Sequence, residues 1–390
     1  MDTTFVVNPG SSSKKYALYR DGREVFSVFF ERIGDEFGHC VEVNGERQIC
    51  GDATRSQFDE GLDEALKRAI AAGVISHIKD ITRVGVRIVA PGTFFTTHRL
   101  IDGAYVRRLS AVVEAAPLHI PHELSEIARV REALPHARIV GVSDSAFHAT
   151  MPQHARLYSI PKKDSVAFDL YRFGYHGLSV ASVVRKIAEE NEGRVPARMV
   201  VCHIGSGMSV TALKEGKSVE TTMGFAPTSG LMMGTRAGEV DPAALIYLFK
   251  QYGNNIEKTE LAVSQMGGLR GMLGSNDLRV AIDRYMKKDP DALIAVAMYI
   301  EGIRKAIGAA AAVLGGVDIL ALTGTAPERN ALVRELITER FAYLGLVLDE
   351  KLNDTLSNRP GVISTPKSPA TMYVVHTEEV AEIARIAGVF

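Results

Sequence analysis

The sequence predicts an α/β protein made of two related halves, and three observations support this fold class. At 390 residues the chain is long enough to bury two hydrophobic cores. Short β-rich runs alternate with longer segments of helical periodicity along the chain. A Gly-Ser turn between two apolar runs occurs at Gly10 and again at Gly205, 195 positions later, which is half the chain. Chance matching of common residues is the alternative to a duplication.

The internal match extends beyond the two glycines. Three further pairs keep the offset of 195: Ser11 and Ser206, Ala17 and Ala212, and Leu18 and Leu213. Each copy has the pattern of strand, Gly-Ser turn and strand, so backbone N–H groups and hydroxyls converge at the turn and form a cradle for an anion. We therefore expect each half to offer one phosphate hairpin to a shared cleft. For either turn taken alone, a polar hairpin tip is the alternative.

In the first half, the periodicity predicts strands at residues 4–7, 84–89 and 137–142 and a helix at 57–72. The dipeptide Asp21-Gly22 is typical of a hairpin turn. Arg87 lies inside a predicted strand, an unusual place for a charge unless its partner is in a cleft. Asp144 follows a strand at its carboxyl end, where ligands bind in open α/β sheets. A helix N-cap is the alternative role for Asp144.

In the second half, helices predominate after the second hairpin. They are expected at residues 179–191, 242–252, 277–285, 292–314 and 378–387, with strands at 318–322 and 372–375. The longest apolar run, residues 306–317, is too short for a membrane span and is interpreted as a buried helix end. We expect one domain over residues 1–148, to which a C-terminal helix at 380–390 returns, and a second over residues 149–379.

Composition narrows the class of function. The net charge is −1, which gives no electrostatic basis for binding nucleic acid or an anionic membrane. Cys40, Cys50 and Cys202 are odd in number and lack metal-ligand spacing. No charged-then-apolar leader stands at residues 1–4. These observations predict a protein of the reducing cytoplasm.

The stretch 224–242 is the most distinctive of the sequence. Its one basic side chain, Arg236, stands between Gly234 and Gly238, so backbone can approach a ligand on both sides. A guanidinium on a glycine-lined loop is typical of a group that grips phosphate or carboxylate in a fork. An irregular loop with a solvated arginine is the alternative. Asp241-Pro242 then opens a helix.

Two histidines join this inventory. His176 lies between Tyr175 and Gly177, where glycine removes steric cover, whereas His119 lies in a stiff apolar segment that equally suits a packed histidine. A strand followed by a glycine turn and a helix start, at residues 318–329, is a common nucleotide-side loop. This inventory of arginines, histidines and oxygen ligands near glycine loops indicates phosphoryl transfer. In that reaction the protein mainly positions donor and acceptor and neutralises the spread negative charge, with Mg²⁺ bridging the phosphates.

The run 222–242 resembles the second signature of the acetate kinase family, the acetate and propionate kinases of the sugar kinase, Hsp70 and actin superfamily. Further motifs of that family follow in order along essentially the whole chain. They include Asn8-Pro9-Gly10-Ser11-Ser12-Ser13, Pro117-Leu118-His119, the segment 144–152 and Tyr175-His176-Gly177. The resemblance implies two actin/ribonuclease H-like domains with duplicated βββαβαβ-type halves and a central cleft. It also implies a homodimer with its interface in the second domain.

The same resemblance implies a role for each matching residue. Arg87 and Arg236 would grip the carboxylate and the migrating phosphoryl group, His119 and His176 would donate to its oxygens, and Asp144 would orient the acceptor. Asn8, Glu379 and Asp144 would hold Mg²⁺ or Mn²⁺. The acyl pocket would comprise Val89, Leu118, Tyr175 and Pro227. The nucleotide and its phosphates would contact Lys15, Ser11, Ser12, His203, Gly205, Ser206, Gly207, Gly234, Asp277, Leu278, Arg279, Gly324, Thr325, Glu328 and Arg329.

Three departures from the family pattern concern glycine loops. Ala90-Pro91-Gly92 stands where the family has His-Gly-Gly, and Gly205-Ser206-Gly207 where it has Gly-Asn-Gly. The adenosine loop, usually Gly-Gly-Ile-Gly-Glu-Asn, reads Gly324-Thr325-Ala326-Pro327-Glu328-Arg329. The resemblance as a whole implies reversible phosphoryl transfer from ATP to acetate or propionate, giving an acyl phosphate, while the departures bear on the identity of the donor. Pyrophosphate or another non-adenine donor, and a binding paralogue without turnover, are the alternatives.

Overall fold

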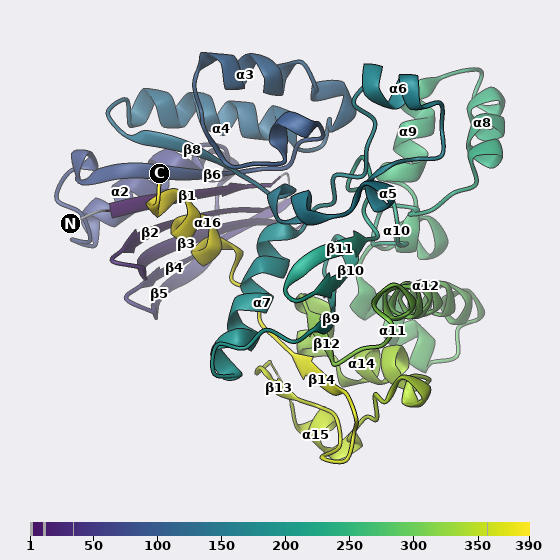
Figure 1. Cartoon of the computed structure of the whole chain (residues 1–390). Helices are drawn as coiled ribbons and strands as arrows, with labels where there is room; N and C mark the ends of the chain where they lie inside the picture. Colours follow the sequence, from purple (N-terminus) through teal and green to yellow (C-terminus); the bar gives the residue numbers. More distant parts are fainter. Residues whose placement is uncertain (1–2, 11–12, 34, 357) are drawn as a thin grey trace. The chain divides into compact units, whose positions relative to one another are not determined.

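The computed structural model describes residues 3–10, 13–33, 35–356 and 358–390. The chain forms two compact units (Figure 1). The first unit comprises Met1–Ala146 together with Glu378–Phe390, and the second unit comprises Phe147–Thr377. The C-terminal helix therefore belongs to the same unit as the N-terminal strands.

The first unit is built on an eight-stranded sheet with the order β5-β4-β3-β2-β1-β6-β8-β7. Its strands are β1 (Thr3–Pro9), β2 (Ser13–Arg20), β3 (Arg23–Ile33), β4 (Glu36–Val43), β5 (Glu46–Ala53), β6 (Ile81–Ile88), β7 (Arg99–Leu100) and β8 (Arg138–Ser143). Strands β1 to β5 form an antiparallel meander, whereas β6 is parallel to β1 and β8 is parallel to β6. The carboxyl ends of β1, β6 and β8 thus meet at one edge, which is where open α/β sheets bind ligands.

Helices cover both faces of this sheet. On one face, α2 (Gly61–Ala71) and α4 (Ile120–Ala133) pack on a core that includes the inward residues Val84 and Val86 of β6. Gly85 points to the opposite face because side chains alternate along a strand. A Cβ on Gly85 would lie 2.7 Å from Ile383 of α16 (Glu379–Gly388), so only glycine allows α16 to pack this closely.

The remaining elements of the first unit are short. They are α1 (Arg55–Asp59), α3 (Gly103–Ser110) and 3₁₀ turns at Ile78–Asp80, Thr93–Phe95 and Val113–Ala115. The single helix expected over residues 57–72 is therefore wrong in one respect, because the chain breaks at Glu60 between α1 and α2. The hairpin turn expected at Asp21-Gly22 is confirmed, and both residues have positive φ.

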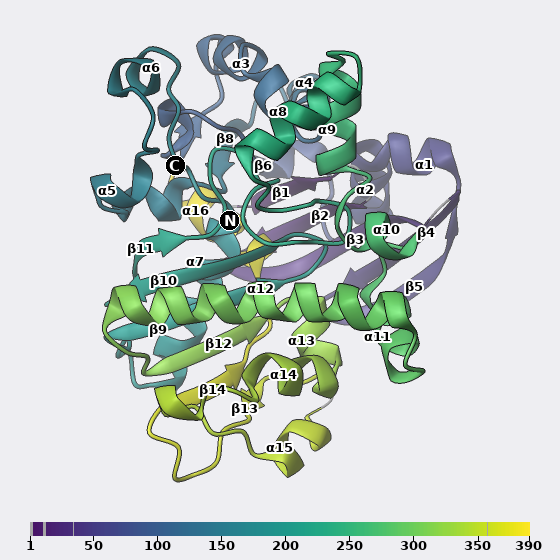
Figure 2. The same cartoon turned by 90° about the vertical axis from the view of Figure 1, so that its right-hand side faces the viewer.

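The second unit has a six-stranded sheet with the order β11-β10-β9-β12-β14-β13 (Figure 2). Its strands are β9 (Arg198–Ile204), β10 (Met208–Lys214), β11 (Lys217–Thr221), β12 (Ile319–Thr323), β13 (Gly361–Val362) and β14 (Thr371–Val374). The series β11-β10-β9-β12-β14 repeats the order and strand directions of β3-β2-β1-β6-β8 in the first unit. The expected α/β class with duplicated halves is thereby confirmed.

The helices of the second unit flank this sheet and extend beyond it. They are α5 (Gln153–Arg156), α6 (Lys162–Ala167), α7 (Gly177–Glu190), α8 (Pro242–Gln251), α9 (Ile256–Ser264), α10 (Gly268–Leu273), α11 (Leu278–Met286), α12 (Pro290–Leu314), α13 (Thr325–Arg329), α14 (Ala331–Thr338) and α15 (Glu350–Thr355). The longest of those described, α12, runs along the sheet beside β9 and β10 (Figure 2). As expected, Asp241 caps α8 and Pro242 is its first residue.

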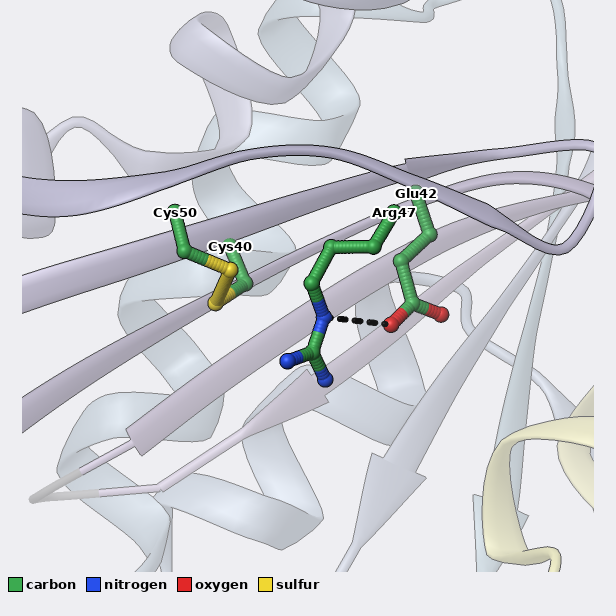
Figure 3. Close-up of a disulfide and its surroundings, with 4 residues drawn as sticks. All are labelled: Cys40, Glu42, Arg47 and Cys50. Carbon is green, nitrogen blue, oxygen red and sulfur yellow. Dashed lines mark ion pairs between the residues drawn. A yellow bond between two sulfur atoms is a disulfide. The ribbon is translucent and has the colours of Figure 1, made fainter.

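Two of the three cysteines form a disulfide in the first unit. Cys40 on β4 faces Cys50 on β5 directly across the antiparallel ladder, beside the ion pair of Glu42 and Arg47 (Figure 3). The cysteine count predicts a reducing compartment, and this disulfide removes the support for that prediction. The count could not indicate the disulfide, because the pairing depends on the register of β4 against β5. Cys202 is buried, and burial raises the pKa of its thiol.

Among the described residues, no helix combines the length and the apolar composition needed to cross a membrane.

Candidate active site

In the first unit, four predicted residues meet at the carboxyl edge of the parallel strands. Arg87 of β6 donates from Nη2 to Asp144 Oδ2 at 2.9 Å and from Nη1 to Asn8 Oδ1 at 3.3 Å. Its Nη1 also lies 3.4 Å from Oε2 of Glu379, the first residue of α16. These side chains come from four elements, so the fold rather than local sequence brings them together. The charge inside a strand is thus explained by two carboxylates.

The charges in this cluster compensate one another. Burial by itself lowers the pKa of Arg87, but the carboxylates of Asp144 and Glu379 outweigh it and raise the pKa. Asp144 is fully buried, and its backbone N–H donates to the carbonyl of Ile88 at 2.9 Å. The guanidinium is thereby fixed in orientation and remains charged at any working pH.

The same cluster has the donor chemistry that Mg²⁺ prefers. Asp144 and Glu379 supply carboxylate oxygens and Asn8 an amide oxygen, and Mg²⁺ is usually held by one or two carboxylates together with waters and phosphates. Within the described part of the chain, no group of three or more His, Cys, Asp or Glu side chains could hold a metal ion. The residues therefore fit a magnesium ion shared with substrate phosphates, not one enclosed by protein ligands.

Glu123 of α4 is a buried carboxyl that sequence reasoning missed. Its Oε1 accepts the N–H of Val89 at 2.7 Å, while its buried Oε2 has no hydrogen-bond partner among the described residues. Burial raises the pKa of Glu123 to about 8, against the opposing effects of the Val89 N–H and Arg87. The helical spacing with Ile120, Ile127 and Val130 places Glu123 in an apolar stripe, a signal that could have identified it.

Other predicted residues of the first unit lie around this edge. His119 is the N-cap residue of α4, one turn before Glu123, and the half-buried Leu118 precedes it. Lys15 pairs with Asn8 in the β1–β2 register, so the two side chains share one face of the sheet. Ser11 and Ser12, predicted to contact phosphate, lie outside the described residues.

The second unit brings His176, Arg236 and the turn of the second hairpin together. A Cβ on Gly207 would lie 3.0 Å from His176 Nε2 and 3.3 Å from Arg236 Nη1. The imidazole and the guanidinium therefore both point at the backbone of this turn, where glycine leaves room for a ligand. His176 adopts a left-handed conformation with φ of 59° at the start of α7, and its Nδ1 pairs with Ser209 Oγ at 3.0 Å.

His203 extends this cluster. Its ring centroid lies 4.1 Å from that of His176, and its Nδ1 pairs with Ser179 Oγ at 2.8 Å. A Cβ on Gly205 would lie 3.4 Å from His203 Nε2 and 4.0 Å from Thr325 Oγ1. The second hairpin, with exposed Ser206 at its tip, is thus next to the start of α13.

Arg236 is held by neutral groups in the part of the chain that the structure describes. Its Nη1 donates to the carbonyl of Pro227 at 3.1 Å and lies 3.6 Å from the sulfur of Met233. Within the described residues no carboxylate pairs with Arg236, and burial lowers the pKa of its guanidinium. A half-buried cation without a counter-ion is destabilising, so this arrangement favours an anionic ligand.

The backbone N–H at the turn before α13 is bound by the side chain of Glu328, which lies in α13 itself. Gly324 has φ of 92°, and a Cβ there would lie 2.6 Å from the carbonyl of Ile204, so the position requires glycine. Oε1 of Glu328 accepts the Gly324 N–H at 2.7 Å. Arg334, fully buried on α14, donates to the carbonyl of Pro327 at 2.6 Å. Arg329 is exposed at the end of α13.

The predicted nucleotide residues of α11 form a local pair. Asp277 caps the N–H of Arg279, and the same carboxylate receives the Arg279 side chain, with Nη2 to Oδ2 at 2.6 Å. Leu278 begins the helix between them. A Cβ on Gly234 would lie 2.9 Å from the carbonyl of Asn276, so this pair follows a segment in contact with the Arg236 loop.

Comparison with known proteins identifies the family of this chain. The family model of the Acetokinase family matches residues 3–385. The chain is 34% identical over 388 residues to acetate kinase from Sulfurovum sp., covering 97% of this chain and 96% of that protein. Acetate kinase from Clostridium acetobutylicum is 35% identical over 393 residues, with 97% and 96% coverage.

Solved structures give the same result. The crystal structure of Porphyromonas gingivalis acetate kinase superposes with a TM-score of 0.86 at 32% identity, covering 100% of this chain and 99% of that one. A propionate kinase from Francisella tularensis superposes with a TM-score of 0.89 at 28% identity, covering 100% of both chains. The chain therefore belongs to the acetate kinase family of phosphotransferases with a carboxyl group as acceptor.

Proposed function

We propose that this protein transfers a phosphoryl group reversibly between ATP and a short-chain carboxylate, acetate or propionate, giving an acyl phosphate and ADP. The observation that carries the proposal is Arg236, a half-buried guanidinium that lies at the same turn as His176 and has no carboxylate partner within the described residues. Such a site favours a species with spread negative charge, as in the transition state of phosphoryl transfer. Direct in-line transfer requires no covalent enzyme intermediate.

The remaining site residues receive roles by the same chemistry. Arg87 and Arg236 bind the carboxylate and the migrating phosphoryl group, His176 and His119 donate to its oxygens, and Asp144 orients the acceptor. Asn8, Glu379 and Asp144 would hold Mg²⁺ or Mn²⁺, which neutralises phosphate charge when bound. We assign the contacts with the acyl group to Val89, Leu118, Tyr175 and Pro227. Val89, Tyr175 and Pro227 are buried, which suits a small apolar group.

The phosphoryl donor has a second candidate, pyrophosphate or another non-adenine donor. Contacts to the donor are assigned to Lys15 and the two hairpin turns, and to His203, Gly234, residues 277–279 and the α13 loop. One observation favours weak adenine selectivity: Pro327 stands where the family's loop has a glycine, and proline has no N–H to offer. The α13 turn therefore has fewer free donors for a nucleotide.

A donor panel tests both candidates. Purified protein is incubated with acetate and Mg²⁺ together with ATP, GTP or pyrophosphate, and acyl phosphate is trapped as the hydroxamate. Acetyl phosphate from ATP supports the proposal, whereas its formation from pyrophosphate alone supports the second donor. Absence of acyl phosphate with every donor and with both acetate and propionate would contradict the function itself.

We also propose a homodimer formed through the second unit. Helix α8 has no buried residue although its sequence is mostly apolar, and Ile246 and Tyr247 are exposed on it. Helices α9, α11 and α12 expose further large apolar side chains, namely Ile256, Met286, Ile294 and Met298. Apolar exposure of this extent marks an interface. Light scattering after gel filtration should give twice the mass of the 42.3 kDa chain, and Tyr247→Glu should lower it.

A further inference from the structure

We infer that Tyr158 and Tyr175 form a clamp on the peptide groups of Phe225, which positions Pro227 and Arg236 and thereby limits the size of the acid that reacts. The inference rests on the proposed function and adds Tyr158 to the site as a positioning residue. Nothing in the sequence motifs pointed to Tyr158, which lies in the segment between α5 and α6.

The clamp holds both polar groups of one residue. The N–H of Phe225 donates to Tyr158 Oη at 2.7 Å, and the carbonyl of Phe225 accepts from Tyr175 Oη at 2.6 Å. The two hydroxyls are provided by segments 50 and 67 residues away in sequence. The position of this stretch of backbone is therefore determined by two distant tyrosines.

The loop next to the clamp is braced internally. Ser229 Oγ accepts the N–H of Gly224 at 2.8 Å and donates to the carbonyl of Ala226 at 3.0 Å. A Cβ on Gly224 would lie 2.3 Å from Tyr158 Oη and 3.0 Å from Ser229 Oγ, so glycine is needed for the tyrosine to come this close. The residues 224–229 consequently move together and not one by one.

This braced loop connects the clamp to the site. Pro227, two residues after Phe225, is buried and accepts a hydrogen bond from Arg236 through its carbonyl at 3.1 Å. That carbonyl is the one backbone acceptor of Arg236 within the described residues. A displacement of Phe225 is thus transmitted both to the Pro227 ring, assigned to the acyl group, and to the guanidinium.

The tyrosines are themselves held in place. The ring of Tyr175 is buried, and the guanidinium of Arg172 lies 5.0 Å from the ring centroid of Tyr158. Neither hydroxyl needs to touch a substrate to act. Removal of one hydroxyl leaves a peptide group of Phe225 without its partner, a local loss that lets the loop shift while the two sheets keep their contacts.

The test uses variants that remove a single oxygen atom: Tyr158→Phe, Tyr175→Phe and the double variant. Tyr343→Phe is the matched control, because Tyr343 is 74% exposed on the same unit. For each protein kcat and KM are measured with acetate, propionate and butyrate, and KM with the phosphoryl donor. Each single variant should lower kcat/KM for acetate roughly 5- to 30-fold and raise the butyrate-to-acetate ratio of kcat/KM.

Three readouts separate positioning from a general structural role. The donor KM and the thermal midpoint should stay close to the wild-type values, and the double variant should lose less than the product of the single losses, because both tyrosines hold one residue. Unchanged acid ratios in both single variants, with an active wild type, would overturn the clamp alone. A wild type that forms no acyl phosphate would overturn the proposed function, and the clamp with it.

Discussion

Replacement of Glu123 by Gln should stabilise the protein at alkaline pH and have little effect at acidic pH. The carboxyl is buried without a hydrogen-bond partner for Oε2 among the described residues, and burial raises its pKa from 4.5 to about 8. Because the folded-state pKa is raised, the stability associated with the protonated form is complete below the unfolded value of 4.5 and is lost as pH rises through about 8.

The expected magnitude follows from this shift. One pKa unit corresponds to about 1.4 kcal/mol, so a rise from 4.5 to about 8 is an upper limit of about 5 kcal/mol in unfolding free energy. Water penetration reduces this value, whereas the opposing effect of Arg87 is already contained in the pKa of about 8. Urea unfolding at pH 5 and pH 9 should therefore show Glu123→Gln near wild type at pH 5 and about 2–4 kcal/mol more stable at pH 9.

Glu126 provides a matched control on the same helix, one turn further along. Its Oε1 pairs with Lys14 Nζ at 2.9 Å and its Oε2 accepts from Tyr16 Oη at 3.0 Å, so its charge has partners. Glu126→Gln should destabilise by about 3 kcal/mol at both pH values, because it leaves the buried Lys14 ammonium with the Asp59 carbonyl at 3.2 Å but without a carboxylate partner. A stability difference between Glu123→Gln and wild type that does not change with pH would refute the reasoning about Glu123.

The remaining predictions concern the site and the disulfide. Arg236→Ala should lower kcat roughly 10²-fold or more, and Arg236→Lys should rescue poorly because a point charge lacks the fork; normal turnover in the Ala variant would remove Arg236 from the site. Val89→Ala should shift preference toward longer acids by about 1–3 kcal/mol per methylene at most, and an unchanged chain-length profile would count against the acyl assignment. Reduction of Cys40–Cys50, which closes a loop with a sequence separation of 10, should lower the unfolding free energy by up to about 3 kcal/mol and leave turnover intact, with Cys50→Ser as the reference. ATP should show a high KM, with GTP or pyrophosphate comparable, because Thr325 and Pro327 add bulk to the loop; a tight ATP KM with rejection of the others would defeat this prediction.

The duplication could be predicted from sequence because each half contains the same short pattern of neighbouring residues. Each copy combines an apolar strand, a glycine turn and a second strand, and such patterns depend on neighbours along the chain. The offset of 195 relates Asn8 of β1 to His203 of β9, and the register places each opposite a residue of the returning strand, Lys15 and Ser209 respectively. The offset of 195 would place Val210 and not Ser209 opposite His203, so the two hairpins differ in register by one residue, and the halves match in strand order and direction and not residue by residue.

Features that depend on contacts distant in sequence could not be predicted this way. Glu123 accepts from a residue 34 positions away, and Tyr158 from one 67 positions away, so no spacing rule connects them. The Cys40–Cys50 disulfide depends on the register of β4 against β5, which is set by the hairpin and not by the cysteine count. Family motifs predicted residues for contact with substrates, Tyr175 among them, but did not indicate the hydrogen bond of Tyr175 to Phe225, nor Tyr158 or Glu123.

Glu328 illustrates how a single position can serve the fold and limit the ligand. A carboxylate that accepts the Gly324 N–H neutralises the amide that a phosphate would otherwise use at that turn. Arg334 fixes the Pro327 carbonyl from the other side, so the turn has little freedom to open. In the proposed site, phosphate binding would then depend on the residues assigned at the two hairpin turns and on Arg236, groups that recognise charge and not a base. Because Gly324 and Glu328 match the adenosine loop of the family, the expected loss of adenine selectivity rests on Thr325, Pro327 and Arg329, which do not match it.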